Sequence, residues 1–435
     1  MTTFDVALQH AADRVQCELH AQDDAWGRSG WTRRRFLAGL GMVGVASLGA
    51  QLVTTRAAYA ADATGTERTL LVIFLRGAAD GLHLLVPNNA ALGLDYLKSV
   101  RADLVPGDAD LQALTGGWAL NARLKPLYDQ LWATGELAFV PALSTQNVSR
   151  SHFQAQQYLE RGGSDTASSG WLDRVLEKLG PGTTFRAVAQ SDRAPMSLAG
   201  TAPSLALSSI EDFQFPGWDE IQTASEVAVR QLYRGLAGPL GEDVPNTIAA
   251  LDTAATIRAG QSNVDYPGGD FGRALKDLAG ILKAEVGLQV ATVDVGGWDT
   301  HTDEVNQLNG QLDDAAAALT TFFDDLGTER RKRVTVAVMT EFGRRVEMND
   351  SGGTDHGHGS VMWLLGGGLT GSGVFGHWEQ LTGAALDDGD VPGWNNPFDV
   401  LGELVQKRLG AGSLYGVFPG YTPKTVQGGP IATTT

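Results

Sequence analysis

The stretch "TLLVIFL" at residues 69–75 is a nearly unbroken run of apolar residues. A strand covered on both faces has this character, whereas a strand with one solvated face alternates apolar and polar residues. We therefore predict a central strand over 69–75. The segments that follow it in the sequence decide which fold this strand belongs to.

Four further segments have the composition of buried strands. They are "ELAFVPAL" (136–143), "GLQVATVDVGG" (287–297), "RVTVAVMTEF" (333–342) and "SVMWLLGGG" (360–368). Helices are predicted directly after the first two of these, and again over 396–410. In the helix of "SHFQAQQYLERG", Ser151 with Gln154 three residues on suggests a capping box. Strands that alternate with helices predict an α/β fold with a doubly wound, mostly parallel sheet sandwiched by helices.

Residues 31–60 have the three-part plan of an export signal. A basic cluster at 33–35 precedes a modest apolar run, and small residues end the segment at 58–60. The stretch "TRRRFL" (32–37) resembles the twin-arginine signal, and the apolar run is too short and glycine-rich for a stable membrane span. We expect cleavage after Ala60, which also removes the only cysteine, Cys17. The destination would be the periplasm or the space outside the cell.

A single α/β domain is predicted over 66–435. Within it, the region from about 162 to 280 is less regular and is a candidate cap or insertion. Acidic residues outnumber basic ones by 50 to 33, giving a formal net charge of −17. Such a surface repels nucleic acid and anionic lipid, so we exclude both as partners. A small anionic substrate would need a local cationic site, and nothing in the sequence indicates a protein partner.

Polar residues gather where the predicted strands end, which is where open α/β sheets bind ligands. Of the six histidines after residue 60, five lie in these segments. The residues collected in this way are Arg76, Asp80 and His83; Ser149, Arg150, Ser151 and His152; Asp299 and His301; and Glu341, Asp355, His356 and His358.

The spacing of these residues favours a metal site. Asp299 and His301 are two residues apart, so in an extended segment both side chains point the same way and could grip one ion at roughly 2.0–2.2 Å. His356 and His358 have the same spacing between glycines, and Asp355 could bind an ion directly or bridge two. Nitrogen and oxygen ligands without cysteine suit zinc, manganese or iron, and carboxylates also admit magnesium or calcium. Ligand type does not choose among these ions, and zinc is our first expectation.

Structural roles compete with this interpretation. Asp80 precedes Gly81 and could be a turn residue, while Asp299 could cap the following helix. A capping role would account for Ser151, and an ion pair with Arg344 or Arg345 would account for Glu341. For each of these residues the local sequence fits both a structural role and a role in the site.

The motifs together resemble a known superfamily. "TDHGHGS" is similar to the Asp-His-small-His stretch of the alkaline phosphatases, which share a superfamily with sulfatases and cofactor-independent phosphoglycerate mutases. "FLRGAADGL", "SRSHFQAQ", "GGWDTH" and "TEFGRRV…GTDHGHG" together look like a twin-arginine-exported branch known as domain of unknown function 1501. The resemblance covers nearly the whole predicted domain and implies an alkaline phosphatase-like fold.

Site roles are implied by this resemblance. One metal would be held by Asp80, Asp355 and His356, and a second by Asp299 and His301 with His358 or His377. Ser151 or Ser149 would be the nucleophile. Arg150 would clamp an anionic group. Asp80 lies four residues later than the phosphatase aspartate, and Asp299 and His301 are two residues apart instead of four, so one-metal and metal-free versions stay open.

Three functions are consistent with these residues. The first is an exported metal-dependent hydrolase of phosphate or sulfate esters, with a serine nucleophile activated by one or two divalent ions. The second is a non-catalytic secreted binding or scaffold protein that retains the fold. The third is hydrolysis of another bond, such as a carboxylic ester or a polysaccharide linkage, by Ser151 and a nearby histidine.

Overall fold

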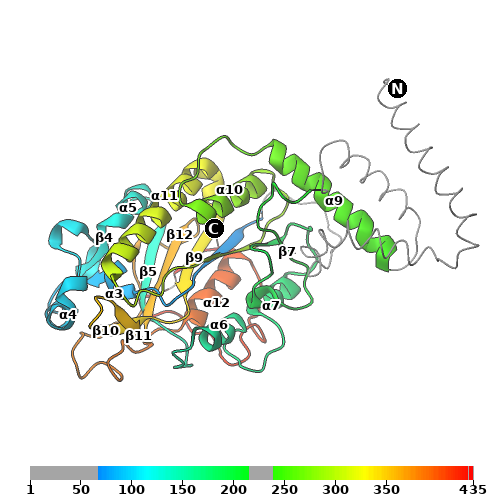
Figure 1. Ribbon diagram of the computed structural model, residues 1–435. Coiled ribbons are helices and arrows are strands. Elements are labelled where there is room, and N and C mark those ends of the chain that lie inside the picture. The colour runs from blue at the N-terminus through cyan, green and yellow to red at the C-terminus, as the bar shows by residue number, and fades with distance from the viewer. Residues whose placement is uncertain (1–66, 215–238, 430, 435) are drawn as a thin grey trace, which may run out of the picture.

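β1 (Thr69–Leu75) lies inside an eight-stranded sheet, as its apolar sequence predicts, and all seven of its residues are buried. It pairs in parallel with β8 (Val290–Val295) on one side and with β9 (Val334–Thr340) on the other (Figure 1). The structure is a computed structural model that describes residues 67–214, 239–429 and 431–434. The expected export signal and Cys17 lie outside these residues.

The strand order of the large sheet is β13-β5-β12-β9-β1-β8-β6-β7. Its other members are β5 (Leu137–Leu143), β6 (Ala187–Gln190), β7 (Leu205–Ala206), β12 (Ser360–Gly366) and β13 (Gly373–Val374). β12 is antiparallel to both β5 and β9, and the remaining pairs are parallel. The mostly parallel sheet of the predicted fold class is confirmed.

The direction of β12 matters for the site. Because this strand runs against its neighbours, it begins at the edge where β5, β9, β1 and β8 end. The loop before β12, which carries His356 and His358, therefore reaches the same edge as the loops that follow the parallel strands.

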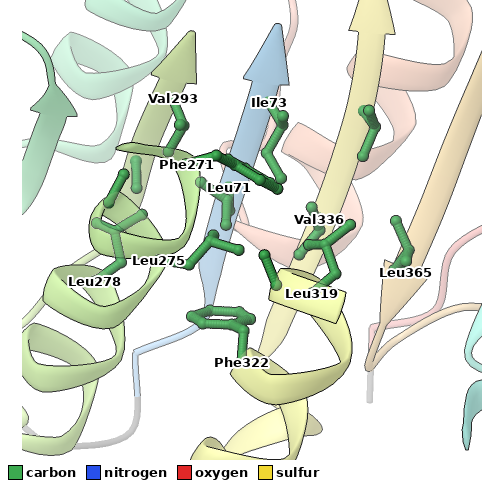
Figure 2. Close-up of a cluster of buried hydrophobic side chains, with 14 of the residues drawn as sticks. Leu71, Ile73, Phe271, Leu275, Leu278, Val293, Leu319, Phe322, Val336 and Leu365 are labelled. Atoms are coloured by element: carbon green, nitrogen blue, oxygen red, sulfur yellow. The ribbon is translucent and has the colours of Figure 1, made fainter. Parts of the chain in front are cut away.

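Helices cover both faces of the sheet. Alternate residues of β1 enter two separate cores, because successive side chains of a strand point to opposite faces. One core contains Leu71, Ile73 and Leu75 with α10 (Gly269–Lys283) and α11 (Glu304–Arg331); the other contains Leu70, Val72 and Phe74 with α7 (Trp171–Leu179) and α12 (Pro397–Arg408). Figure 2 shows Leu275 of α10 and Leu319 of α11 against the strands in the first core. This double coverage is what the apolar strands predict.

The remaining elements surround this framework. The helices are α3 (Gly81–Leu84), α4 (Leu94–Arg101), α5 (Lys125–Leu131), α6 (His152–Glu160) and α9 (Pro239–Ala259). A small sheet has the order β2 (Leu85–Pro87), β4 (Trp118–Asn121), β3 (Leu111–Ala113), and β10 (Arg344–Met348) pairs with β11 (Thr354–His356). β6 and β7, from the irregular 162–280 region, extend one side of the large sheet. Within the described ranges, every helix is too short or too polar to cross a bilayer.

Candidate metal centre

Four side chains from three separate segments meet at the edge of the sheet. His152 begins α6, Asp299 and His301 follow β8, and His356 ends β11. The Nε2 atom of His356 lies 3.0 Å from the Nε2 atoms of both His152 and His301, and 3.1 Å from Asp299 Oδ1. We call these four residues the histidine cluster. Within it, the ligand atoms of His152, Asp299 and His356 all lie within 4.8 Å of one another.

The other ring nitrogen of each histidine contacts a hydrogen-bond acceptor. His152 Nδ1 lies 2.8 Å from Glu341 Oε1, His301 Nδ1 lies 3.2 Å from Asp355 Oδ1, and His356 Nδ1 lies 2.9 Å from the carbonyl oxygen of Arg150. A carbonyl oxygen or an ionised carboxylate can only accept. Each neutral imidazole therefore carries its proton on Nδ1, and its Nε2 lone pair faces the cluster.

This arrangement fits a divalent cation. Three lone pairs and a carboxylate oxygen that face one another repel unless a positive charge lies among them. Ligands at about 2.0–2.2 Å from a tetrahedral ion lie about 3.3 Å apart, close to the separations in the cluster. Ligating histidines in proteins also donate their second ring N–H to a carboxylate or carbonyl, as these three do. His152, Asp299 and His356 would hold the ion, with His301 as the adjoining ligand.

Arg344 fixes the position of Asp299. Its fully buried guanidinium donates to Asp299 Oδ1 at 2.6 Å. It also donates to four backbone carbonyl oxygens, those of Gly77, Ala78, Trp298 and Thr354. Burial favours the neutral acid at Asp299, but the hydrogen bond and the charge of Arg344 oppose it, and the pKa of this carboxyl is lowered. Asp299 is therefore an anion that one arginine ties to the neighbouring loops.

Glu341 orients His152 by contacting its Nδ1, the ring nitrogen that faces away from the cluster. Its carboxylate is buried and accepts hydrogen bonds from His152 Nδ1, Gln156 Nε2 at 2.9 Å, and the backbone N–H of Gly77 at 3.0 Å. Burial alone would raise the pKa of Glu341, but the hydrogen bond from His152 and the other donors lower it. The hydrogen bond to Glu341 in turn raises the pKa of His152. Glu341 thus orients an imidazole and makes no ion pair with Arg344 or Arg345.

Two glycines let the loops come together. Gly77 has φ +123°, and a Cβ there would lie 2.5 Å from the backbone nitrogen of Asp299. A Cβ at Gly357 would lie 2.4 Å from the backbone carbonyl carbon of Arg344. The glycine beside His356 therefore serves the close packing of backbone on backbone.

Two of the expected metal ligands lie apart from the cluster. Asp80 accepts a hydrogen bond from the backbone N–H of Leu82 at 3.1 Å, and its carboxylate pairs with Arg101. His358 Nδ1 lies 3.0 Å from Ser144 Oγ. A third residue, Asp355, is close but set back, because its carboxylate contacts His301 Nδ1 and Asn349 Nδ2. Of the residues expected to bind metal, the structure brings together Asp299, His301 and His356.

The predicted capping box is wrong. Ser151 is the N-cap residue of α6, but its side chain makes no capping hydrogen bond. Gln154 instead accepts from Ser149 Oγ at 2.8 Å. The Ser151 hydroxyl is therefore not engaged by its helix and directly precedes His152. Arg150, the expected clamp, pairs with Asp390 at 2.7 Å and Asp388 at 3.2 Å, and its side chain is 40% exposed.

His152 was not expected among the metal ligands. Its position after a predicted strand, together with the other polar residues collected there, was the one sign in the sequence that it belongs to the site. Its role depends on Glu341 and His356, each more than 180 residues away along the chain. Because Ser149, Arg150 and Ser151 directly precede it, this segment was expected to supply a nucleophile instead.

Comparison with solved structures returns several proteins at low sequence identity. They include the alkaline phosphatase of the Antarctic bacterium TAB5, at 11% identity and a TM-score of 0.31, covering 71% of this chain and 94% of that one. The C-terminal periplasmic domain of EcEptC from Escherichia coli, in complex with zinc, has 12% identity and a TM-score of 0.35, covering 85% and 91%. BT1596, a 2-O GAG sulfatase, has 12% identity and a TM-score of 0.27, covering 72% and 65%.

Comparison with curated protein sequences finds no match. A family match covers residues 140–392, which include all four residues of the histidine cluster together with Glu341 and Arg344. The region before 140, with β1 and Asp80, lies outside the matched range. The chain belongs to the family described as protein of unknown function, DUF1501.

Proposed function

We propose that this chain is an exported hydrolase of phosphate or sulfate esters that depends on one divalent metal ion held by the histidine cluster. One observation carries the proposal: three imidazole Nε2 atoms and the Asp299 carboxylate converge while acceptors hold all three Nδ1 atoms. Zinc is the first candidate for such a ligand set, with manganese, magnesium or calcium as alternatives. A bound ion would act as a Lewis acid on an ester oxygen.

The residues around the cluster suggest how the chain would handle an ester. Ser151, whose hydroxyl has no capping bond, is the candidate nucleophile. Its Oγ would bond to the phosphorus or sulfur atom while the bond to the alcohol oxygen breaks. The hydroxyl proton would pass through water to the leaving alcohol, and a second water would release the acid. Arg150 lies one residue away and would attract the anionic group, although Asp388 and Asp390 now share its charge.

The test combines metal analysis with an ester panel. Protein purified without chelators should contain close to one metal ion per chain, and His356→Ala should contain almost none. The panel covers phosphate and sulfate monoesters and diesters. We expect Ser151→Ala to lower kcat by about 100-fold or more, because nucleophile removal raises the barrier by several kcal/mol. Ser149→Ala is the matched control, since the Ser149 hydroxyl already donates to Gln154.

Two outcomes would reject the proposal. Absence of metal from wild-type protein, even after incubation with zinc and manganese, would remove its basis. Bound metal without turnover of any ester, unchanged by either serine substitution, would favour the non-catalytic binding protein. Export through the twin-arginine route, with cleavage after Ala60, is tested separately by N-terminal sequencing of protein recovered from the periplasm; a chain that still begins at Met1 would contradict it.

A further inference from the structure

A second group of polar and charged side chains is buried beside the loops that carry the histidine cluster. Arg101, the last residue of α4, donates to both carboxylate oxygens of Asp80, and its Nη2 lies 3.7 Å from Glu304 Oε1. The other oxygen of Glu304 accepts from Thr354 Oγ1 at 2.7 Å. The side chains of Asp80, Arg101 and Glu304 are at most 1% exposed. We call Asp80, Arg101, Glu304 and Thr354 the arginine cluster.

The oxygen atoms of the arginine cluster are those of a hard-cation site. Two carboxylates and a hydroxyl are ligand types that magnesium and calcium select. Glu304 Oε1 is buried and has no hydrogen-bond partner among the described residues. Such an oxygen costs free energy unless a positive charge compensates it. The guanidinium of Arg101, with Nη2 at 3.7 Å, is the positive charge close to it.

The charges of the cluster balance around this arginine. Burial raises the pKa of Glu304 to about 8, with a further contribution from the nearby Asp80 carboxylate. Arg101 lowers the pKa of Asp80 against the effect of burial. At neutral pH the cluster thus contains one anion, one cation and one protonated acid. A divalent ion in place of the guanidinium would let both carboxyl groups ionise.

The arginine cluster also joins the loops that carry metal ligands. Asp80 follows β1, Glu304 is three residues beyond His301, and Thr354 is two residues before His356. The metal set that the resemblance implied, Asp80 with Asp355 and His356, does not fit this geometry, because Arg101 occupies the carboxylate of Asp80.

We propose that Arg101 is a built-in cation that fills an oxygen site otherwise suited to a divalent metal ion. The chain then carries one exchangeable ion, in the histidine cluster, and one permanent positive charge in the arginine cluster. This inference goes beyond the proposed function and does not depend on ester hydrolysis.

The experiment removes the arginine and offers magnesium in its place. Arg101→Ala should melt at a lower temperature than wild type, and millimolar Mg²⁺ should restore more than half of the lost melting temperature. Wild-type protein should gain little from the same Mg²⁺. Arg186→Ala is the matched control, because Arg186 is also buried but donates to the carbonyl oxygens of Leu176 and Gly180. Magnesium should not restore its melting temperature.

Glu304→Gln on the Arg101→Ala background should abolish the rescue, because one ionisable ligand is then missing. If Arg101→Ala does not fold on its own, the yield of refolding from urea with and without Mg²⁺ gives the same comparison. The proposal is overturned if Mg²⁺ and Ca²⁺ help Arg101→Ala no more than they help Arg186→Ala. It is also overturned if wild-type protein binds two metal ions per chain. Neither result bears on ester turnover.

Discussion

Asp80 and Asp299 follow β1 and β8, two strands that lie side by side, yet their environments differ. The side chain of Asp80 is 1% exposed and paired with Arg101, whereas that of Asp299 is 46% exposed and faces imidazole lone pairs. Arg344 supplies only one hydrogen bond to Asp299, and its other donors go to the backbone. Two aspartates in similar loops thus each pair with a buried arginine, but they differ in exposure and in their other neighbours. Asp80 lies in a closed site, whereas an ion could reach Asp299 from solvent.

The largest expected effect comes from making the same substitution at both positions. Asp80→Asn would remove the closest anionic partner of the buried Arg101, and breaking a buried ion pair costs about 3–5 kcal/mol of unfolding free energy. Asp299→Asn should cost less in metal-free protein, since Arg344 keeps its four backbone carbonyls, but it should remove the bound metal. Urea unfolding and metal analysis of both variants test this contrast. A stable Asp80→Asn that has lost its metal would reverse the roles assigned to the two residues.

A smaller effect is expected from changing Glu341, the partner of His152 Nδ1. Glu341→Gln should weaken metal binding by about 10–100-fold, because a carboxylate partner raises the basicity of a ligating imidazole. Competition with a chelator measures the affinity. Asp355→Asn is the control, because the Asp355 side chain is 61% exposed and its hydrogen bond to His301 is longer, so a weaker effect is expected. An equal loss in both variants would mean that burial of the partner does not matter here.

The last prediction concerns pH. The pKa of Glu304 is raised from 4.5 to about 8, so the folded chain keeps a proton that the unfolded chain releases. Stability from this group is present below pH 4.5 and is lost as pH rises toward 8. Glu304→Gln, which cannot titrate, should flatten the decline in melting temperature over that range. Glu329→Gln, at a side chain that is 82% exposed, should leave the profile unchanged; a steeper slope in Glu304→Gln would contradict the assignment.

The fold could be predicted because burial on two faces leaves a direct signature in each strand. "TLLVIFL" contains alternate residues that enter opposite cores, so the whole strand has to be apolar. The direction of β12 has no such signature, because a strand buried on both faces has the same composition whether it runs parallel or antiparallel. That direction follows from pairing with β5 and β9, which are distant in sequence.

The candidate site was only partly predictable. Asp299, His301 and His356 were found because strand ends and short spacing are local signals. The roles of Asp80 and His152 depend on partners elsewhere: Arg101 comes from a different helix, and Glu341 from the end of another strand. Whether the Ser151 hydroxyl makes a capping bond likewise depends on which serine contacts Gln154. Both Ser149 and Ser151 are near Gln154 in the sequence, and in the structure Ser149 makes the contact. Local sequence names the residue types, and tertiary contacts assign their roles.

The antiparallel strand β12 has a consequence for how the chain matures. It lies between β5 and β9, so the segments that carry His152 and His356 meet only when this late strand has inserted between two earlier ones. An unfolded chain keeps these ligands apart along its contour and offers no comparable affinity for an ion. A metal present at about 100 times its Kd would then stabilise the native state by about 2.7 kcal/mol. Ion capture would then stabilise the assembled sheet, and a metal-loaded chain would be one in which β12 already lies between β5 and β9.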